Sequence, residues 1–453
     1  MTSEVVVMNS LAVALAADSA ATVSGGPKDK VYKSANKLFM LSEFHPVGIM
    51  VYNNAALLGV PWETIIKLFR RDLAGEELPT ISEYSTRFLG FLDDNRNLFP
   101  TKVQDRYFLD LIRTRFAALI KDFKKAFVTG LMEEATPDLL GDALGEIKRV
   151  VLEERDRLKI LKDCDCCSAK LADQMVGRQS GQVNDLIRDV FQSLELDAET
   201  TSALYQIAGF LVSKAEIAPE TLSGVVIAGF GCDEHFPVMQ SFEVGAVFGD
   251  RLKHESQFDI AIDQETESCV QPFADAEMAN TFLSGINAKF EIRILEEVAE
   301  TVAGLVDGAI DVIADLSSAQ KEHWKSVIAP ARDGAMEKLW DQLEAHRESN
   351  HLDPIHSAIR NLPKDELAHV AASLVNLNSF QKRMSLDPET VGGPIDVAVI
   401  SKGDGFVWID RKHYFRAELN QHFLSRYRRA PHAENPRKEP TSVDKGKRAP
   451  GIG

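Results

Sequence analysis

The sequence lacks any apolar run of the roughly 20 residues that a helix needs to cross a bilayer. It also lacks a G-x-x-x-x-G-K-[ST] phosphate-binding loop, so an ATP-driven step would require a separate chain. Basic residues are outnumbered, with 51 Lys and Arg against 68 Asp and Glu and a net charge of -17. Because nucleic-acid binding needs a basic surface, we expect no nucleic-acid partner. Because no apolar run is long enough to cross a bilayer, we expect no membrane partner either.

Cysteine is scarce as well, with five residues in 453. An odd number in a long chain fits a reducing compartment better than a disulfide framework. Three of the five lie in Cys164-Asp165-Cys166-Cys167, but no Cys/His pair follows at the spacing of a structural zinc site. We therefore expect no metal and no cofactor.

The N-terminus carries no Lys or Arg before its first apolar run, and Glu4 adds a negative charge. Ala14-Leu15-Ala16 resembles the cleavage pattern of a secretory signal, but Asn9-Ser10 interrupts the apolar run. A β-hairpin fits better, with strands over 5–8 and 11–17 joined by a turn at Asn9-Ser10. We expect a cytoplasmic protein that begins with this hairpin.

Along the chain, β-rich and helical segments alternate in large blocks. Helical periodicity dominates 75–222, with long helices over 106–128 and 144–161, and returns over 274–377. β-rich stretches lie at 1–60, 223–262 and 395–409, the last with a hairpin turn at Lys402-Gly403-Asp404-Gly405. We expect a helix over 414–427. Because no short βαβ unit repeats, the pattern favours one sheet-bearing core with helical insertions.

The predicted segments follow these blocks. They are a first core part (1–74), a helical insertion (75–222), a second core part (223–290), a second helical insertion (291–380), the last core strands and helix (381–427), and a disordered basic tail (428–453).

Several motifs occur in the order found in one known family. The stretches concerned are Leu15-Ala16-Ala17-Asp18-Ser19 with Ala21-Thr22, Lys37-Leu38-Phe39-Met40-Leu41, Gly48-Ile49-Met50 with Ala55-Ala56, Ile227-Ala228-Gly229-Phe230, and Gly392-Gly393 before Ile395 to Ile400 with Asp404-Gly405. Together they resemble the proteasome-type, β-subunit-like threonine peptidases, closely over about the first 60 residues and loosely over perhaps 100 later ones. The resemblance implies an α+β fold, an Ntn-hydrolase four-layer αββα sandwich of antiparallel sheets, here with two helical insertions.

The resemblance also implies a nucleophile. In that family a threonine begins the mature chain and precedes the aspartate of the "AADS" segment by sixteen residues, and Thr2 precedes Asp18 by 18 minus 2, which is sixteen. Removal of Met1 would expose Thr2. Its own α-amine, with a reference pKa of about 7.7 to 8.0, could then act as the base that activates the hydroxyl.

By the same resemblance, Lys37 lowers the pKa of that amine and Asp18 pairs with Lys37. Lys30 and Lys33 compete for this role. Lys37 is preferred because Leu38 to Leu41 make the best apolar strand after it.

Two positions depart from the family pattern. Ala20 stands where catalytic relatives carry a basic residue, and Tyr52 stands where an oxyanion-hole glycine is usual. The Tyr52 N–H can still donate a hydrogen bond, but we expect its side chain to narrow or fill the specificity pocket. The departures make an inactive scaffold an alternative.

Two further site residues rest on the resemblance. Ser268 could correspond to a serine that supports the N-terminal amine, with a helix expected to begin near Pro272; otherwise Ser268 is a helix-start residue. Asp387 or Glu389 could supply a second supporting carboxylate, and Glu389 is the residue chosen.

The sequence therefore predicts an amide-bond hydrolase, a threonine peptidase with Thr2 as nucleophile, that acts on peptides or proteins. The expected partners are further copies of the chain; whether a separate ATP-driven unfoldase cooperates stays open. Two alternatives stay open: a catalytically silent assembly subunit, and an N-terminal amidohydrolase acting on a small molecule.

Overall fold

The computed structural model describes residues 2–23, 30–133, 139–192, 194–219, 221–385, 391–413, 415–422 and 425. These belong to two compact units, Met1–Arg411 and Lys412–Gly453. In the second unit the described residues contain a short 3-10 turn, Ala417–Leu419. Both ends of the helix predicted over 414–427, and the whole tail predicted over 428–453, lie outside the described residues.

Two five-stranded sheets form the centre of the first unit in the described part of the chain, with strand orders β12-β1-β2-β13-β14 and β11-β10-β9-β6-β5. Every pairing within them is antiparallel, which confirms the α+β class with antiparallel sheets. The strands are β1 (Ser3–Asn9), β2 (Ala12–Ala17), β5 (Leu38–Met40), β6 (Val47–Asn53), β9 (Ser223–Gly229), β10 (Val238–Phe248), β11 (Arg251–Ala261), β12 (Ser268–Ala274), β13 (Asp396–Ser401) and β14 (Gly405–Asp410). Two small ribbons pair β3 (Ala21–Val23) with β4 (Lys30–Tyr32) and β7 (Ala56–Leu57) with β8 (Val60–Pro61).

Helices fill the long intervals between these strands. They are α1 (Trp62–Leu73), α2 (Ile81–Asp94), α3 (Thr101–Glu133), α4 (Leu139–Ile160), α5 (Ala169–Arg178), α6 (Ser180–Phe191), α7 (Ala198–Ser213), α8 (Glu277–Ser284), α9 (Ala288–Asp311), α10 (Ser318–Arg347), α11 (Asp353–Arg360) and α12 (Lys364–Met384), with a π-helix over Glu348–Leu352. Within the described ranges, no helix combines the length and the apolar character needed to span a membrane.

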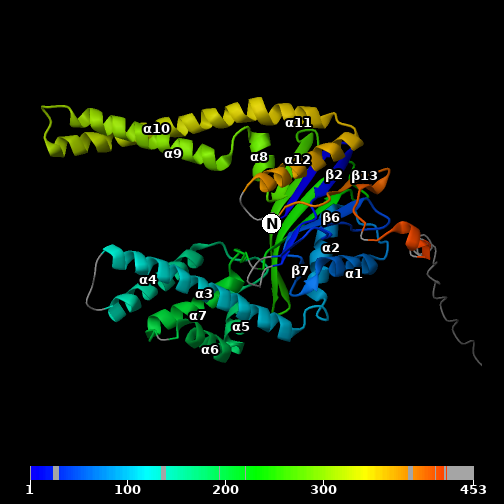
Figure 1. Cartoon of the computed structure of the whole chain (residues 1–453), viewed down its shortest axis with the longest axis horizontal. Coiled ribbons are helices and arrows are strands. Elements are labelled where there is room, and N and C mark those ends of the chain that lie inside the picture. Colours follow the sequence, from blue (N-terminus) through cyan, green and yellow to red (C-terminus); the bar gives the residue numbers. More distant parts are fainter. Residues whose placement is uncertain are drawn as a thin grey trace, which may run out of the picture. The chain divides into compact units, whose positions relative to one another are not determined.

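Three buried clusters show that the unit is built in four layers. One cluster joins the inner faces of the two sheets. A second lies between the first sheet and helices α8, α11 and α12, and a third between the second sheet and α1, α2 and the α3–α7 block. Figure 1 shows α12 over the strands of the first sheet. Both faces of each sheet are therefore covered over its central strands, whereas the edge strands β11 and β14 are largely exposed.

Strands β1 and β2 show how the sequence produces these layers. Val6 and Met8 face the other sheet, and Val5 and Val7 face the outer helices, so alternate residues enter different cores. The outward face of β2 carries the small residues Ala12, Ala14 and Ala16, and α12 packs on it. Asn9 ties α11 to the end of β1, because its Nδ2 donates to the carbonyls of Ile359 at 3.0 Å and Leu362 at 2.9 Å.

The predicted N-terminal hairpin is confirmed, as are the hairpin of β13 and β14 and the long helices α3 and α4. The helix expected to begin near Pro272 is wrong, because Ser268–Ala274 forms strand β12 and pairs with β1. Proline cannot donate a ladder hydrogen bond, but β12 is an edge strand, where this loss is tolerated.

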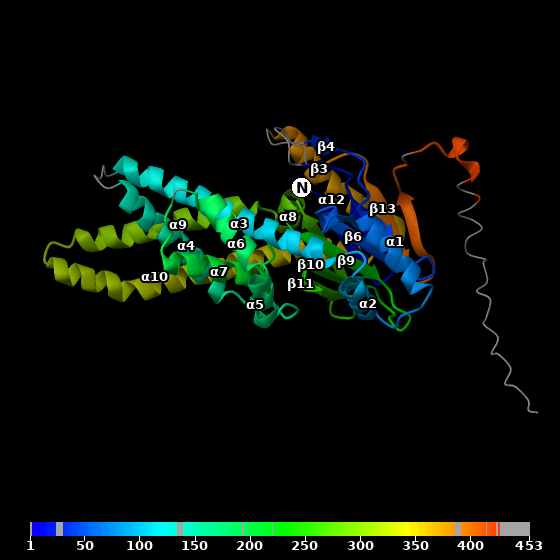
Figure 2. The ribbon, with the colours of Figure 1, turned by 90° about the horizontal axis from the view of Figure 1, so that it is seen from below.

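The two helical regions differ in burial. Helices α3 to α7 place many large side chains in the core, such as Phe108, Phe116 and Leu204. Helices α9 and α10 run side by side as a hairpin (Figure 2), and Ile310 is their one buried residue. Helix α12, which falls in the second predicted insertion, packs on β1 and β2. The predicted segment boundaries stay predictions.

Candidate active site

Thr2 lies immediately before strand β1, at the end of the first sheet. Its carbonyl oxygen accepts a hydrogen bond from the Asp275 N–H at 2.7 Å, which continues the pairing of β1 with β12. The residue is buried and lines a cavity of about 660 Å³ that Lys37 also lines. The backbone around Thr2 is thus held on the partner-strand side while the residue borders an open space.

Asp18 and Lys37 form a buried ion pair beside this cavity, with 2.5 Å between Lys37 Nζ and Asp18 Oδ1. The carboxylate also accepts the Ser3 N–H at 3.1 Å, the Ala20 N–H at 3.1 Å and the Gly392 N–H at 2.8 Å. Four donors therefore hold one carboxylate, and one of them belongs to the residue after Thr2. These hydrogen bonds offset the free-energy cost of burying the two charges.

Local structure explains why these two residues meet. Asp18 follows the last residue of β2, and Lys37 precedes the first residue of β5, so each strand delivers its charged neighbour to the same end of the sandwich. The Lys37 carbonyl accepts from the Val51 N–H at 2.9 Å, which fixes its backbone against β6. Of the two competing lysines, Lys30 is exposed with its ammonium over the Tyr32 ring, and neither Lys30 nor Lys33 lines the cavity.

Glu4 is a second buried carboxylate, two residues from Thr2 on the same face of β1. Both of its carboxylate oxygens are buried, and neither has a hydrogen-bond partner among the described residues. Burial raises the pKa of Glu4 to about 8; the Lys37 charge opposes this rise and the Asp18 charge adds to it. The Glu4 side chain is therefore mostly neutral at pH 7. Glu4 was not among the site residues predicted from the sequence.

Tyr52 lies in β6 and points into the core between the sheets. Its ring centroid is 5.7 Å from that of Phe273, and the ring occupies the space over Gly224, where an added Cβ would lie 1.8 Å from it. The neighbouring Val51 and Asn53 line the cavity instead. The expectation that the Tyr52 side chain narrows the pocket is thus corrected, because strand alternation turns it to the other face. The role of its N–H stays a prediction.

Ser268 lies at the wrong end of the sheet to support the amine of Thr2. It pairs with Asn9, whereas Ala274 pairs with Ser3, so the strand separates Ser268 from Thr2 by roughly 20 Å. Its hydroxyl donates to the His356 carbonyl at 2.9 Å, which is a structural contact with α11. The proposed support of the amine by Ser268 is corrected accordingly. Asp387 and Glu389 lie outside the described residues.

Asp275 lies opposite Thr2 where the pairing of β12 with β1 continues. It was not among the residues predicted from the sequence. It forms an ion pair with Lys382 of α12, with 3.1 Å between Nζ and Oδ2, and the two side chains are only 10% and 6% exposed. Nearby, Asn378 of the same helix donates to the Ser3 hydroxyl at 2.7 Å. Helix α12 thus supports the N-terminal residues from the outer face of the sheet. Only the pairing of β12 with β1 reveals this neighbourhood.

The rest of the cavity mixes amide and apolar side chains. Asn36 and Glu63 line it and are linked at 3.3 Å between Nδ2 and Oε2, and Leu58 and Trp62 add apolar surface. The site can therefore bind a ligand that carries both hydrogen-bonding groups and an apolar group. In the described part of the chain, no three His, Cys, Asp or Glu side chains are grouped so as to hold a metal ion.

Comparisons with known proteins give few relatives. No family model matches the chain, and no curated protein matches it. Among solved structures, it is similar to Anbu from Hyphomicrobium sp. strain MC1 and to an Anbu (Gly-1) mutant from the same strain. In both comparisons the identity is 10%, the TM-score is 0.28, and the alignment covers 96% of this chain and 98% of the other. Such values do not establish a shared activity.

These findings correct the family expectation. Membership of the proteasome-type, β-subunit-like threonine peptidases is wrong, because no family model matches and the similar solved structures are Anbu chains. The motifs that suggested it are short and rich in alanine and glycine, residues that many strand ends and turns share. Any function therefore has to rest on the geometry around Thr2.

Proposed function

We propose that the chain is an amide-bond hydrolase in which removal of Met1 exposes Thr2 as an N-terminal nucleophile. One observation carries the proposal: the buried Asp18–Lys37 pair lies at a cavity that Thr2 also lines, and Asp18 holds the Ser3 N–H next to the nucleophile. We propose peptides or proteins as substrates, because the cavity combines amide side chains with apolar surface.

Each residue has a defined part in this chemistry. The α-amine of Thr2 takes the hydroxyl proton as the oxygen attacks the amide carbonyl, and returns a proton to the leaving amine. The Lys37 ammonium keeps the α-amine neutral by like-charge repulsion and stabilises negative charge near the hydroxyl. Asp18 is a positioning residue, since it contacts Lys37 and the Ser3 backbone.

The arrangement of layers supports the proposal. We propose that the helix–sheet–sheet–helix order is an Ntn-hydrolase sandwich, with the nucleophile immediately before a central strand. Strand β1 lies between β12 and β2 in its sheet, so its backbone is held on both sides. A nucleophile at this place has little freedom to move, which favours a reactive geometry.

N-terminal mass analysis and an activity assay test the proposal together. Purified protein should begin at Thr2 and hydrolyse a mixed library of short peptide amides. Lys37→Ala should remove the hydrolysis while retaining the far-UV circular dichroism of the folded chain, and Lys30→Ala serves as the matched lysine control. Retention of Met1 in an active preparation, or full activity of Lys37→Ala, would contradict the assignment.

A second candidate, an assembly subunit without catalysis, has its own supporting observation. The α9–α10 hairpin exposes large apolar side chains, among them Phe290, Leu305, Trp324 and Trp340. Exposed apolar surface of this extent is typical of protein interfaces. We propose that copies of the chain associate through the hairpin. Sedimentation equilibrium should show an oligomer that the double variant Trp324→Glu/Trp340→Glu converts to monomer; unchanged mass would contradict this.

A further inference from the structure

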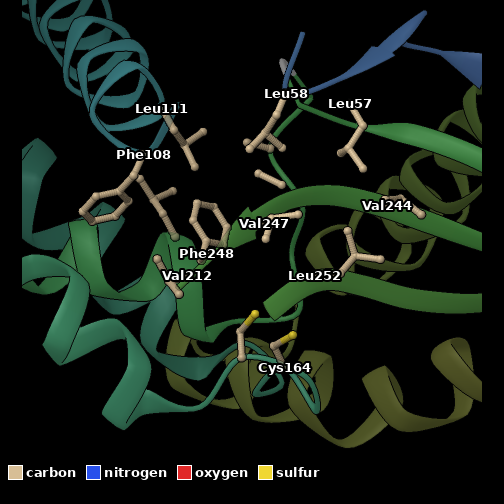
Figure 3. Packing of buried hydrophobic residues seen from close by; sticks show 14 of the residues in the cluster. Leu57, Leu58, Phe108, Leu111, Cys164, Val212, Val244, Val247, Phe248 and Leu252 are labelled. Carbon is tan, nitrogen blue, oxygen red and sulfur yellow. The ribbon is translucent and has the colours of Figure 1, made fainter. Parts of the chain in front are cut away.

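Three of the five cysteines gather at a point remote from Thr2 in the chain. They lie in the loop between α4 and α5, which packs against strand β11, and Cys164 is buried in the cluster drawn in Figure 3. The Sγ atoms of Cys164 and Cys166 are 3.6 Å apart. Cys167 is fully buried, whereas Cys166 is partly exposed.

The loop that carries these thiols is held on both sides. The Cys164 N–H donates to the Ser213 carbonyl at 2.8 Å, and Lys214 Nζ lies 2.7 Å from Asp163 Oδ1. On the other side, Cys166 Sγ lies 3.1 Å from the His254 carbonyl oxygen and 3.4 Å from His254 Nδ1. The spacing of the two sulfurs is therefore imposed by the fold.

A cation is buried beside the thiols. Lys253 precedes His254 on β11, and its Nζ donates to the carbonyls of Leu211 at 2.8 Å and Glu216 at 2.7 Å. Burial lowers the pKa of Lys253, and the charge of Cys164 opposes that effect. Hydrogen bonds with Cys166 and Cys167 lower the pKa of the Cys164 thiol. This direction, together with the 3.6 Å spacing of its sulfur from that of Cys166, selects Cys164 as the attacking thiol.

We propose that Cys164 and Cys166 form a redox site whose substrate is hydrogen peroxide and whose product is a disulfide between them. The two sulfurs need to approach by only about 1.5 Å to reach the S–S bond length. The small size of the oxidant matters, because Cys164 is buried and its neighbour Cys166 is only partly exposed.

The reaction balances in two steps. The Cys164 thiolate attacks one peroxide oxygen, the O–O bond breaks, and hydroxide leaves and takes a proton from solvent, which gives Cys164 sulfenic acid and water. Cys166 then passes its proton to His254 Nδ1 while its sulfur attacks Cys164 Sγ. The sulfenic hydroxide leaves and takes that proton as a second water. The two thiols lose two electrons, and the peroxide gains them.

Tryptic mapping of the full-length chain tests this proposal. Cleavage after Lys162 and Lys170 places all three thiols in one peptide, 163–170. After peroxide treatment and alkylation, this peptide should have lost two hydrogens and should carry the alkyl group on Cys167 alone. Free thiols per chain should fall from five to three.

Cys232 gives an internal reference, because it is exposed and the structure gives it no thiol partner among the described residues. Oxidation of the 164–166 pair should exceed that of Cys232 by roughly tenfold or more. A disulfide between Cys164 and Cys167, or faster oxidation of Cys232, would overturn the proposal. Because these readouts use the unmodified chain, they do not depend on any variant folding.

Variants then test the order of the steps. Cys166→Ser should accumulate a sulfenic acid at Cys164, captured by dimedone, because the resolving thiol is missing. Cys164→Ser should form neither the sulfenic acid nor the disulfide, and Cys232→Ser should behave as wild type. Dimedone capture at Cys166 in the Cys164→Ser chain, at the wild-type rate, would overturn the assignment of Cys164 as the attacking thiol.

Discussion

The surroundings of Asp18 and those of Glu4 differ sharply, although both carboxyl groups are fully buried near Thr2. Asp18 accepts hydrogen bonds from three backbone N–H groups and from Lys37, whereas Glu4 has no partner among the described residues. Burial raises the pKa of Glu4 to about 8. Depth of burial alone therefore does not set the charge of a carboxyl group; the donors that its backbone neighbours supply decide it.

The largest expected effect is the loss of the Asp18 carboxylate. Asp18→Ala should lower the free energy of unfolding by about 3 to 5 kcal/mol, because Lys37 and three N–H groups lose their acceptor. Urea unfolding measures the loss. The exposed pair of Asp404 with Lys364, at 2.6 Å, gives the matched control, for which Asp404→Ala should lower the free energy of unfolding far less, because solvent screens that pair. Equal costs for the two variants would remove the distinction.

Glu4 should respond to pH in the opposite sense from a paired carboxylate. Its folded-state pKa of about 8 lies above the ordinary glutamate pKa of 4.5, so its contribution to stability is complete below pH 4.5 and is lost as pH rises through 8. Within that pH window the free energy of unfolding should fall by about 1.4 kcal/mol per pH unit. Glu4→Gln should abolish this slope and be more stable than wild type above pH 8. Parallel curves for both proteins would show that Glu4 titrates normally.

A smaller effect on the free energy of unfolding is expected from the packing of the Tyr52 ring over Gly224. Gly224→Ala forces the Tyr52 ring to move and should cost about 1 to 3 kcal/mol. Tyr52→Leu in the same chain should recover part of that loss, since it vacates the space above residue 224. Chemical denaturation of the two single variants and the double variant gives the coupling energy. A coupling energy of zero would show that the Tyr52 ring does not contact residue 224.

Part of this site could be predicted from the sequence. Asp18 and Lys37 each border an apolar strand, so short-range pattern indicates where they lie. Glu4 could not be selected, because one glutamate before Val5 and Val6 is equally typical of an exposed strand start. Asp275 was missed for another reason. It reaches Thr2 only through the register of β12 on β1, and Pro272 made that strand resemble a helix start.

The fold likewise has parts that a local sequence pattern predicts and parts that depend on contacts between distant segments. The hairpin of β1 and β2 rests on a local two-residue turn at Ser10-Leu11, one residue beyond the predicted Asn9-Ser10, because Asn9 pairs with Ala12. The packing of α12 (Lys364–Met384) on β1 (Ser3–Asn9) and β2 (Ala12–Ala17) joins segments from opposite ends of the unit, and no local pattern encodes it. Ser268 was misassigned because its place in the sequence does not show at which end of the sheet it lies.

The most direct test of the central claim is covalent labelling of Thr2 by a peptide epoxyketone. This reagent closes a ring with both a hydroxyl and an adjacent free amine, so it reports the N-terminal arrangement. We predict that intact-mass and peptide analysis will find the inhibitor on Thr2 of a chain that has lost Met1, and no labelling of Thr2→Ala. Complete removal of Met1 with no labelling of Thr2, across several peptide side chains, would contradict the hydrolase and favour the silent assembly subunit.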